Sequence, residues 1–522
     1  MSYVSFTFLV FMLVCSILYY ALPKSWRPYV LLTASYVFYF LSSKSLIVFM
    51  LATTLLIYIG GILIGKLNDE FKLKKSSLEK PEIKILKEKT AKKKRMVVTI
   101  TVLLNFGILA FLKYFNFFGE SINSIFGTSV STLNLALPLG ISYYTLQATS
   151  YVIDVYRGKI KADKNLGRLA LFVSFFPQIV EGPIGKYDQL APQLYEGHSF
   201  DHNNVVLGLQ LVLWGLFKKM VIADRIAMPV NEIFGDSEYS GLVVIAAIIF
   251  YTIQIYAEFS GCMDIVRGCA RIFGVDLAKN FERPFFSRSI AEFWRRWHIT
   301  LGAWLRDYIF YSVSLSKGFL KLNKNAKKHM NAHFANFIPM SCALFFVWFG
   351  NGIWHGAGWK YIVYGLYYYV IMMLAKFFEP VTNKVLEKLK IDTSKKLYKL
   401  WQIIRTSILV CFGMLIFRAD TLTQAKDMFM SIGRNFTFSV LSDGTFLNFD
   451  LNVGDYVILA LSIALMFAIS VFQEKGHSIR AELCKQNIII RWIAYFALLF
   501  TIIIFGVYGE GYNVGTFIYG QF

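Results

Sequence analysis

Long apolar segments recur along almost the whole chain, and they limit its possible folds more than any other feature. A helix needs about 20 apolar residues to cross a bilayer, and backbone inside a bilayer must pair its own polar groups. We therefore predict an all-α polytopic integral membrane protein with roughly 10–13 membrane segments. The candidate segments are residues 5–22, 29–41, 45–64, 97–118, 135–155, 205–222, 241–256, 338–349, 361–377, 401–417, 456–472 and 492–507.

The composition argues against a soluble protein. Of the 522 residues, 56% are hydrophobic and only 17% are charged, whereas about a quarter of a soluble domain is charged. The formal net charge of +21 could indicate a nucleic-acid-binding protein. However, the Lys and Arg residues lie in short runs between apolar segments, as the cytoplasmic loops of membrane proteins do. We therefore expect membrane lipid around the chain and no nucleic acid partner.

The basic runs also predict the orientation of the chain. Residues 66–95 hold twelve Lys and Arg against five Asp and Glu, whereas residues 119–139 hold no Lys or Arg. The positive-inside rule places residues 66–95 in the cytoplasm and the N-terminus outside. Because no Lys or Arg follows Arg491, the C-terminus is also expected outside. Three Lys-rich stretches are predicted to be solvated loops, at residues 66–95, 317–328 and 384–399.

Three segments differ from simple lipid-facing helices, and the first is residues 169–184, LALFVSFFPQIVEGPI. Pro177 and Pro183 interrupt it, and Gln178 and Glu181 lie in an apolar setting. Broken backbone at membrane depth is tolerated only where protein or water surrounds it. We therefore predict a re-entrant or cavity-lining segment, with a loop that reaches only the interface as the alternative.

The second segment is residues 283–311, RPFFSRSIAEFWRRWHITLGAWLRDYIFY. Ser289 is a predicted helix N-cap, with Glu292 at the capping-box position. Apolar residues then recur at helical spacing opposite charged ones, which predicts an amphipathic helix at the membrane interface. His298 is the exception, because it lies between Trp297 and an apolar Ile-Thr-Leu run. We expect its imidazole to point into the protein.

The third segment is residues 346–361, FVWFGNGIWHGAGWKY, where four glycines surround His355 within an aromatic run. An ionisable residue in such a segment is a candidate functional residue, with an ordinary packed histidine as the alternative. The sequence has no His-Glu-x-x-His, Walker loop, Gly-x-Ser-x-Gly or Cys-x-x-Cys motif. We therefore expect no metal site and no Ser-His-Asp nucleophile.

Several motifs together resemble the membrane-bound O-acyltransferase family, and in particular its bacterial alginate O-acetyltransferase branch. They are LPLGISYYTLQ (137–147), PQIVEGPI (177–184), FSGCMDIVRG (259–268), NFERPFFSRSIAEFWRRWHITLGAWLRDYIFY (280–311), GIWHG (352–356) and the ending TFIYGQF (516–522). The resemblance implies broken helices around a central tunnel. It also implies one membrane domain over residues 1–522, with N-terminal spans at 1–168, a catalytic core at 169–378 and C-terminal spans at 379–522.

The resemblance further implies that His355 is the principal catalytic residue and that His298 is its partner. Acyl transfer from a thioester to a hydroxyl needs a base for the hydroxyl proton, and burial keeps histidine in its neutral, basic form. The residues expected to contact substrate are Gln178, Glu181, Trp297, Trp354 and Asp307.

The expected reaction moves an acetyl group from a cytoplasmic thioester to a hydroxyl of an extracytoplasmic polysaccharide. Acetyl coenzyme A is the expected donor, no bound cofactor is expected, and the expected partner is an exported acetyltransferase that acts on the polysaccharide. The expected location is the bacterial cell membrane, crossed many times. D-alanyl transfer to teichoic acid is the alternative within the family, and a transporter or flippase is the alternative from another class.

Overall fold

The computed structural model describes residues 1–236 and 238–508, so the motif at residues 516–522 lies outside the described part. Across these two ranges the secondary structure is helical, apart from an isolated bridge between Phe281 and Trp297. The chain forms two compact units, one of Met1–Leu209 with Val266–Ala278 and one of Gln210–Ile265 with the chain from Lys279 onward. The prediction of an all-α fold is confirmed.

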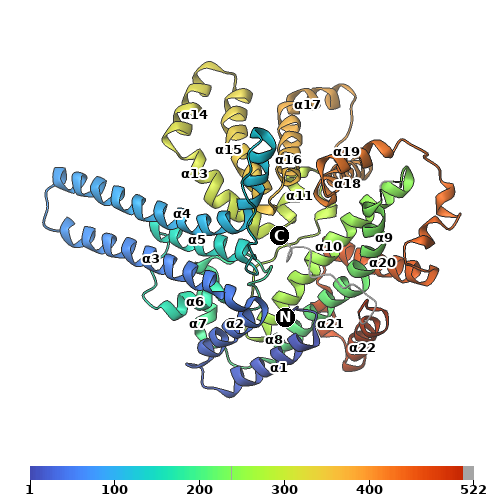
Figure 1. The fold of residues 1–522 in the computed structure, drawn as a ribbon, viewed down its shortest axis with the longest axis horizontal. Coiled ribbons are helices and arrows are strands. Elements are labelled where there is room, and N and C mark those ends of the chain that lie inside the picture. Colours follow the sequence, from blue (N-terminus) through green and yellow to red (C-terminus); the bar gives the residue numbers. More distant parts are fainter. Residues whose placement is uncertain (237, 509–522) are drawn as a thin grey trace. The chain divides into compact units, whose positions relative to one another are not determined.

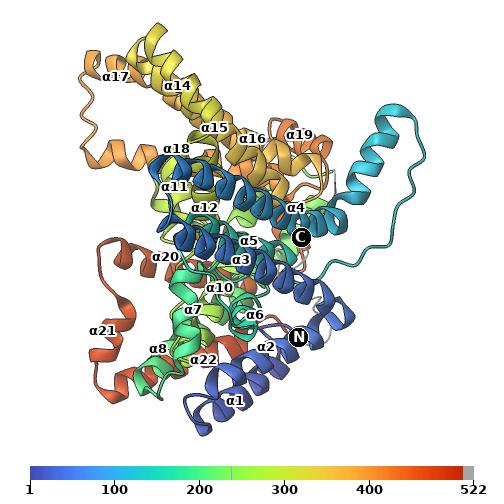
Figure 2. The same cartoon turned by 90° about the vertical axis from the view of Figure 1, so that its left-hand side faces the viewer.

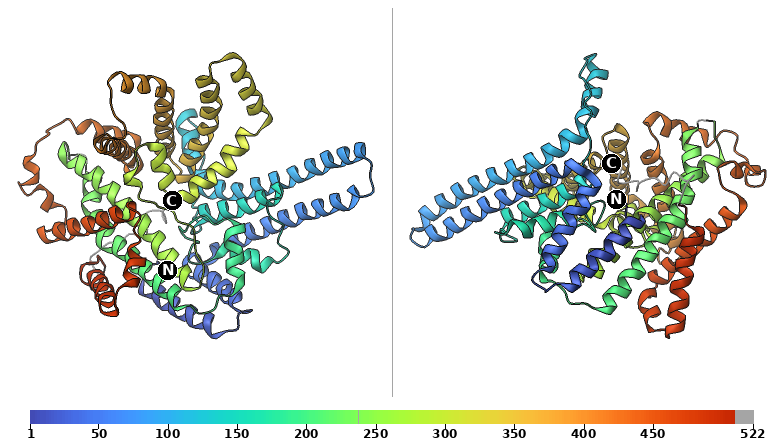
Figure 3. Two further views of the ribbon diagram at one scale, coloured as in Figure 1. Left: turned by 180° about the vertical axis from the view of Figure 1, so that it is seen from behind. Right: turned by 60° about the horizontal axis from the view of Figure 1, so that its bottom comes forward.

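The first unit is built around a long hairpin of two helices, α3 and α4, which run side by side (Figures 1 and 3). Helix α5 packs against both and is buried over almost its whole length. After α4 the chain returns in extended form over residues 127–138 (Figure 2). The elements are α1 (Phe6–Ala21), α2 (Arg27–Ser43), η1 (Lys44–Leu46), α3 (Ile47–Lys75), α4 (Lys80–Phe126), α5 (Ile141–Arg157), α6 (Leu166–Ser174), α7 (Tyr187–Glu196), and parts of α8 (His202–Leu216) and α10 (Leu242–Ile272).

The basic tip of this hairpin is helical, so the prediction of a solvated loop at residues 66–95 is wrong. Only residues 76–79 separate α3 from α4. Glu79 and Glu82 form a reciprocal capping box, and Pro81 lies in the first turn of α4. Lys, Glu and Leu have high helix propensity, so a charged run of these residues does not have to be a loop. The other two predicted loops are also largely helical, for the same reason. Residues 317–328 form one helix, and residues 384–399 include the end of one helix and the start of the next.

The second unit holds the rest of the chain, including the later parts of α8 and α10. A π-helical segment, η2, continues α8 directly into α9. The remaining elements are η2 (Phe217–Ala223), α9 (Asp224–Gly235), η3 (Pro284–Phe286), α11 (Ile290–Arg296), α12 (Ile299–Trp304), η4 (Leu305–Phe310), α13 (Tyr311–Ser314), α14 (Lys317–His329), α15 (Ala332–His355), α16 (Trp359–Phe377), α17 (Glu379–Lys388), α18 (Lys396–Arg418), α19 (Leu422–Ser431), η5 (Ser439–Leu441), η6 (Thr445–Asn448), α20 (Val453–Glu474), α21 (Ile479–Lys485) and α22 (Ile488–Phe505).

Within residues 1–236 and 238–508, eight helical stretches are long and apolar enough to cross a membrane, or nine if the bent pair α16 and α17 counts as one span. The sequence predicted more membrane segments than this, and the following features explain the difference. Helices α2 and α3 form one apolar stretch of 49 residues, α1 has only 16 residues, and α5 has only 17. The number and composition of the spans make this a multi-pass membrane protein.

Candidate active site

His298 lies at a break between two short helices of the second unit. Helix α11 ends at Arg296 and α12 begins at Ile299, so the prediction of one amphipathic helix through this segment is wrong. The predicted N-cap is confirmed, because the Ser289 side chain accepts from the Glu292 N–H. His298 has φ 46° and ψ 52°, in the left-handed region that residues other than glycine rarely occupy. Only 2% of its surface is exposed, so the imidazole lies inside the protein as expected.

Asn280 holds this break in place. Its side-chain oxygen accepts from the backbone N–H of Thr300 at 2.9 Å and from the Thr300 hydroxyl at 2.7 Å. Its backbone oxygen accepts from the Ile299 N–H at 3.0 Å, and its side-chain N–H donates to the Met263 sulfur at 3.0 Å. Asn280 is buried, and these bonds satisfy backbone groups that a helix start would otherwise leave unpaired. Sequence analysis gave Asn280 no role, because nothing local to it indicates these partners.

The second histidine, His355, is the last residue of α15 and is 3% exposed. The centroid of its ring lies 5.0 Å from that of Trp354, 5.7 Å from Tyr364 and 5.3 Å from Phe417. The Trp354 ring also lies 5.7 Å from the ring of His298. Trp354 therefore joins both imidazoles in one buried aromatic cluster. Tyr364 and Phe417 are members that the sequence analysis missed, since no pattern in the sequence connects them to His355.

Burial determines the charge of His298. It lowers the pKa of the imidazole to about 3, because water no longer stabilises the protonated form. A neutral imidazole carries one nitrogen that donates and one that accepts a hydrogen bond. His298 is therefore neutral at physiological pH, with one ring nitrogen of each kind.

The other two candidates in the second unit occupy different surroundings. Trp297 is buried, with its ring centroid 5.0 Å from that of Phe281 and 5.4 Å from that of Phe293, so it packs the break next to His298. Asp307 lies in the π-helical segment η4 and forms an ion pair with Arg306 at 2.9 Å. The structure thus brings Trp354 to both histidines, while Trp297 supports the backbone and Asp307 is paired on its own helix.

Gln178 and Glu181 lie in the first unit, in a segment that leaves α6 at Ser174 and contains no helix before Tyr187. This break was predicted from the prolines and is confirmed. Glu181 is only 1% exposed and Gln178 is also buried, as a cavity-lining segment requires. Gln178 lines a small pocket together with Tyr143, Tyr144, Gln147, Val173, Ile179, Gly182, Pro183 and Ile184.

Gln147 of α5 holds this second break. Its side-chain oxygen accepts from the side-chain N–H of Gln178 at 2.8 Å and from the Gly185 N–H at 3.1 Å. The turn also requires glycine at position 182, because a Cβ there would lie 2.3 Å from the Gln178 Cα. The local backbone is therefore fixed by one amide side chain and one glycine.

Comparison with known proteins reveals relatives of this chain. The model of the membrane-bound O-acyltransferase (MBOAT) family matches residues 161–415. The chain is 30% identical to the probable alginate O-acetylase AlgI of Azotobacter vinelandii over 420 residues, 80% of this chain and 74% of that protein. It is 32% identical to the peptidoglycan O-acetyltransferase of Helicobacter pylori over 320 residues, 56% of this chain and 57% of that protein. It is 30% identical to the teichoic acid D-alanyltransferase of Bacillus subtilis over 296 residues, which are 54% of this chain and 69% of that protein.

The many apolar helices and the aromatic cluster define a multi-pass membrane protein that keeps two histidines away from water. The matched region, residues 161–415, contains both of these histidines. The chain belongs to the membrane-bound O-acyltransferase family and is an O-acyltransferase. Membership of this family separates it from the transporters and flippases considered from the sequence.

Proposed function

We propose that this protein transfers an acetyl group from acetyl coenzyme A in the cytoplasm to a hydroxyl of an extracytoplasmic polysaccharide, through an exported partner enzyme. The observation that carries this proposal is the pair of buried histidines around Trp354. Acetyl transfer is favoured over other acyl groups by the 30% identity to an alginate O-acetylase over 80% of the chain.

In this proposal His355 is the general base. The proton of the acceptor hydroxyl passes to the His355 imidazole. At the same time the oxygen of that hydroxyl attacks the carbonyl carbon of the thioester. The carbon–sulfur bond then breaks and the leaving thiolate takes up the proton, so that His355 ends the cycle neutral. A base works best when its pKa is near the working pH. The low pKa of His298 therefore suits a neutral hydrogen-bonding partner rather than a second base.

The proposed donor and acceptor reach these histidines from opposite sides of the membrane. The basic tip of the α3–α4 hairpin would attract the phosphates of coenzyme A at the cytoplasmic side. Gln178 and Glu181 would contact substrate along its path, as polar groups that line a protected cavity. The central tunnel implied by the resemblance stays a prediction.

Labelled acetyl coenzyme A supplied to inside-out vesicles tests the reaction and the donor together. We expect label on a polysaccharide acceptor inside the vesicle lumen, and none in matched vesicles that contain equal amounts of the His355→Ala variant. If label enters the lumen only from a D-alanyl carrier protein, the alternative of D-alanyl transfer to teichoic acid replaces this proposal. That alternative has support from the 30% identity to a teichoic acid D-alanyltransferase.

The orientation has its own test. A cysteine introduced at Lys80, in the tip of the α3–α4 hairpin, should react with a membrane-impermeant reagent only after the membrane is opened. A cysteine at Ser2 should react from outside in intact cells. Labelling of the Lys80→Cys variant from outside would reverse the proposed orientation, including the extracytoplasmic termini.

A further inference from the structure

Three buried charged side chains of the second unit have no role so far. Lys218 and Lys219 are adjacent in the π-helical segment η2, and Glu258 lies on α10. They lie in the apolar stretches His202–Gly235 and Leu242–Ile272. Charged groups are expensive there unless each one is paired, so their presence calls for a physical reason.

Both lysines are tied to α10. The Lys219 ammonium lies 2.9 Å from the Glu258 carboxylate. The Lys218 ammonium lies 2.9 Å from the Ser260 hydroxyl and 2.7 Å from the Asp264 carboxylate. The lysines therefore contact α10 at positions that span about two helical turns.

The two helices approach closely where these contacts form. A Cβ on Gly261 of α10 would lie 3.3 Å from the Lys218 Cβ and 3.4 Å from the Lys219 backbone nitrogen. A π-helical turn accommodates an extra residue in a helix and is often found at functional sites. Here it allows two consecutive lysines to reach the same neighbouring helix.

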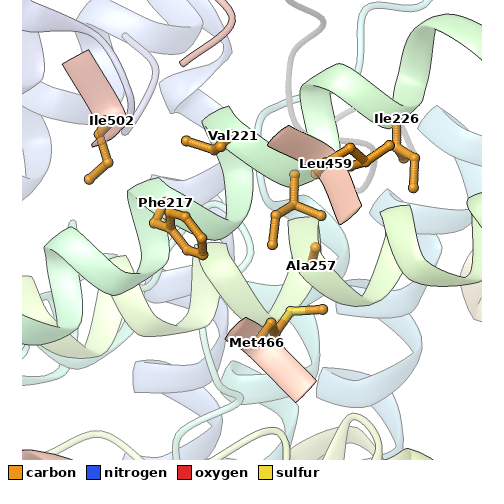
Figure 4. Packing of buried hydrophobic residues seen from close by; sticks show 9 residues of the cluster. Phe217, Val221, Ile226, Ala257, Leu459, Met466 and Ile502 are labelled. Atoms are coloured by element: carbon orange, nitrogen blue, oxygen red, sulfur yellow. The ribbon is translucent and has the colours of Figure 1, made fainter. Parts of the chain in front are cut away.

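Apolar packing also holds η2 in place. Phe217 and Val221 of η2 belong to a buried cluster with Leu459 and Met466 of α20 and Ile502 of α22 (Figure 4). The same cluster includes Ala257 of α10, so η2 is held against its neighbours by burial of apolar surface as well as by charge pairs. Such a segment is a rigid support for α10.

The stretch of α10 held by the lysines also supports His298. Phe259 follows Glu258 directly, and the centroid of its ring lies 4.9 Å from that of His298. One turn later on α10, Met263 accepts the hydrogen bond from Asn280, which orders the break at His298.

We propose that Lys218 and Lys219 are positioning residues, which fix α10 and thereby orient the His298 imidazole for acyl transfer. This inference rests on the proposed function, in which His298 acts at the reacting groups. Neither lysine has to touch substrate. Their effect reaches the reaction through Phe259 and through the hydrogen bond between Met263 and Asn280.

A matched pair of variants separates this role from general stabilisation. Lys219 also pairs with Asp224, five residues along its own helix, at 2.6 Å. Glu258→Met removes the link between Lys219 and α10 and leaves Lys219 paired with Asp224. Asp224→Leu removes a carboxylate from the same ammonium and leaves the link to α10 intact. Both variants change the charge of the cluster by the same amount.

Steady-state kinetics of purified full-length protein, with acetyl coenzyme A and a soluble hydroxyl acceptor, give the decisive readout. We expect Glu258→Met to lower kcat by about 10-fold to 100-fold, as small misplacements of reacting groups do, with little change in the donor KM. Asp224→Leu should keep nearly wild-type kcat. Glu258→Gln, whose amide oxygen still accepts from Lys219, should recover much of the loss.

Each other outcome has a definite meaning. Equal losses in Glu258→Met and Asp224→Leu would overturn the inference, as would a loss that appears only in KM. In a Phe259→Leu background, Glu258→Met should lower kcat by a smaller factor than it does in the wild type. The same factor in both backgrounds would also overturn the inference. If Glu258→Met does not insert, Glu258→Ala and Asp224→Ala give the same comparison, because alanine cannot accept a hydrogen bond from Lys219. An inactive wild type would instead refute the proposed function.

Discussion

Two helix breaks, one in each compact unit, are built in the same way and present different chemistry. In the first unit Gln147 holds the chain around Gln178, and in the second unit Asn280 holds the chain around His298. In both, one buried amide side chain pairs with backbone N–H groups that the missing helix cannot satisfy.

The difference lies in what each break exposes to its surroundings. The first break contains a glycine at its tight turn, Gly182, and the amide of Gln178 lines a small pocket there. The second break places an imidazole in the left-handed position, among aromatic rings. The first arrangement suits binding and the second suits proton transfer. Variants at the two breaks should therefore affect KM and kcat differently.

The largest effect is expected at the aromatic cluster of the second unit. His355→Ala should lower the rate of acyl transfer by about 10²-fold to 10⁴-fold, the usual contribution of a general base. Membrane insertion and thermal stability should stay close to wild type, and His298→Ala should also impair transfer severely. Transfer is measured with labelled donor and purified protein. Nearly wild-type transfer by His355→Ala would remove the basis for the catalytic assignment.

The second prediction concerns pH. The pKa of His298 is about 3 in the folded protein and near 6.5 once the chain unfolds. Between these values the unfolded chain binds a proton that the folded chain does not, so stability falls as the pH falls through this window. The slope from this group is at most about 1.4 kcal/mol per pH unit. His298→Gln should flatten the dependence of thermal unfolding on pH between 6.5 and 4. An unchanged slope would show that His298 protonates normally.

The third prediction compares the two amides that hold the breaks. Asn280→Ala and Gln147→Ala should each lower the free energy of unfolding by about 1–3 kcal/mol, because each removes an acceptor from a buried N–H group. Asn280→Ala should also lower kcat, since it loosens the backbone at His298. Gln147→Ala should raise KM more than it lowers kcat. If both variants change KM and kcat in the same way, the two breaks do not have separate roles in substrate binding and in the chemical step.

The smallest effect is expected for Gln178→Leu. This change removes one side-chain hydrogen bond in the pocket of the first unit, a contribution of about 0.5–1.5 kcal/mol. We expect KM for one substrate to rise up to about 10-fold, with kcat unchanged, in the same kinetic measurement. A fall in kcat instead would place Gln178 among the residues that act on the reacting groups.

The sequence predicted the helical membrane class, the break at residues 169–184 and the burial of His298, because composition, prolines and flanking residues report local preferences. It did not predict the break at Trp297–His298, since the amphipathic pattern continues across it. Asn280 and Phe259 were missed for another reason. Their importance depends on partners 17 or more residues away, and no local pattern records such partners.

The left-handed backbone at His298 lowers the stability of the folded protein. A residue with a Cβ held there costs about 1–3 kcal/mol, whereas glycine occupies the same conformation freely. His298→Gly would relieve this strain, but it would also leave a cavity among the aromatic rings, and emptying a buried site of that size costs about 2–5 kcal/mol.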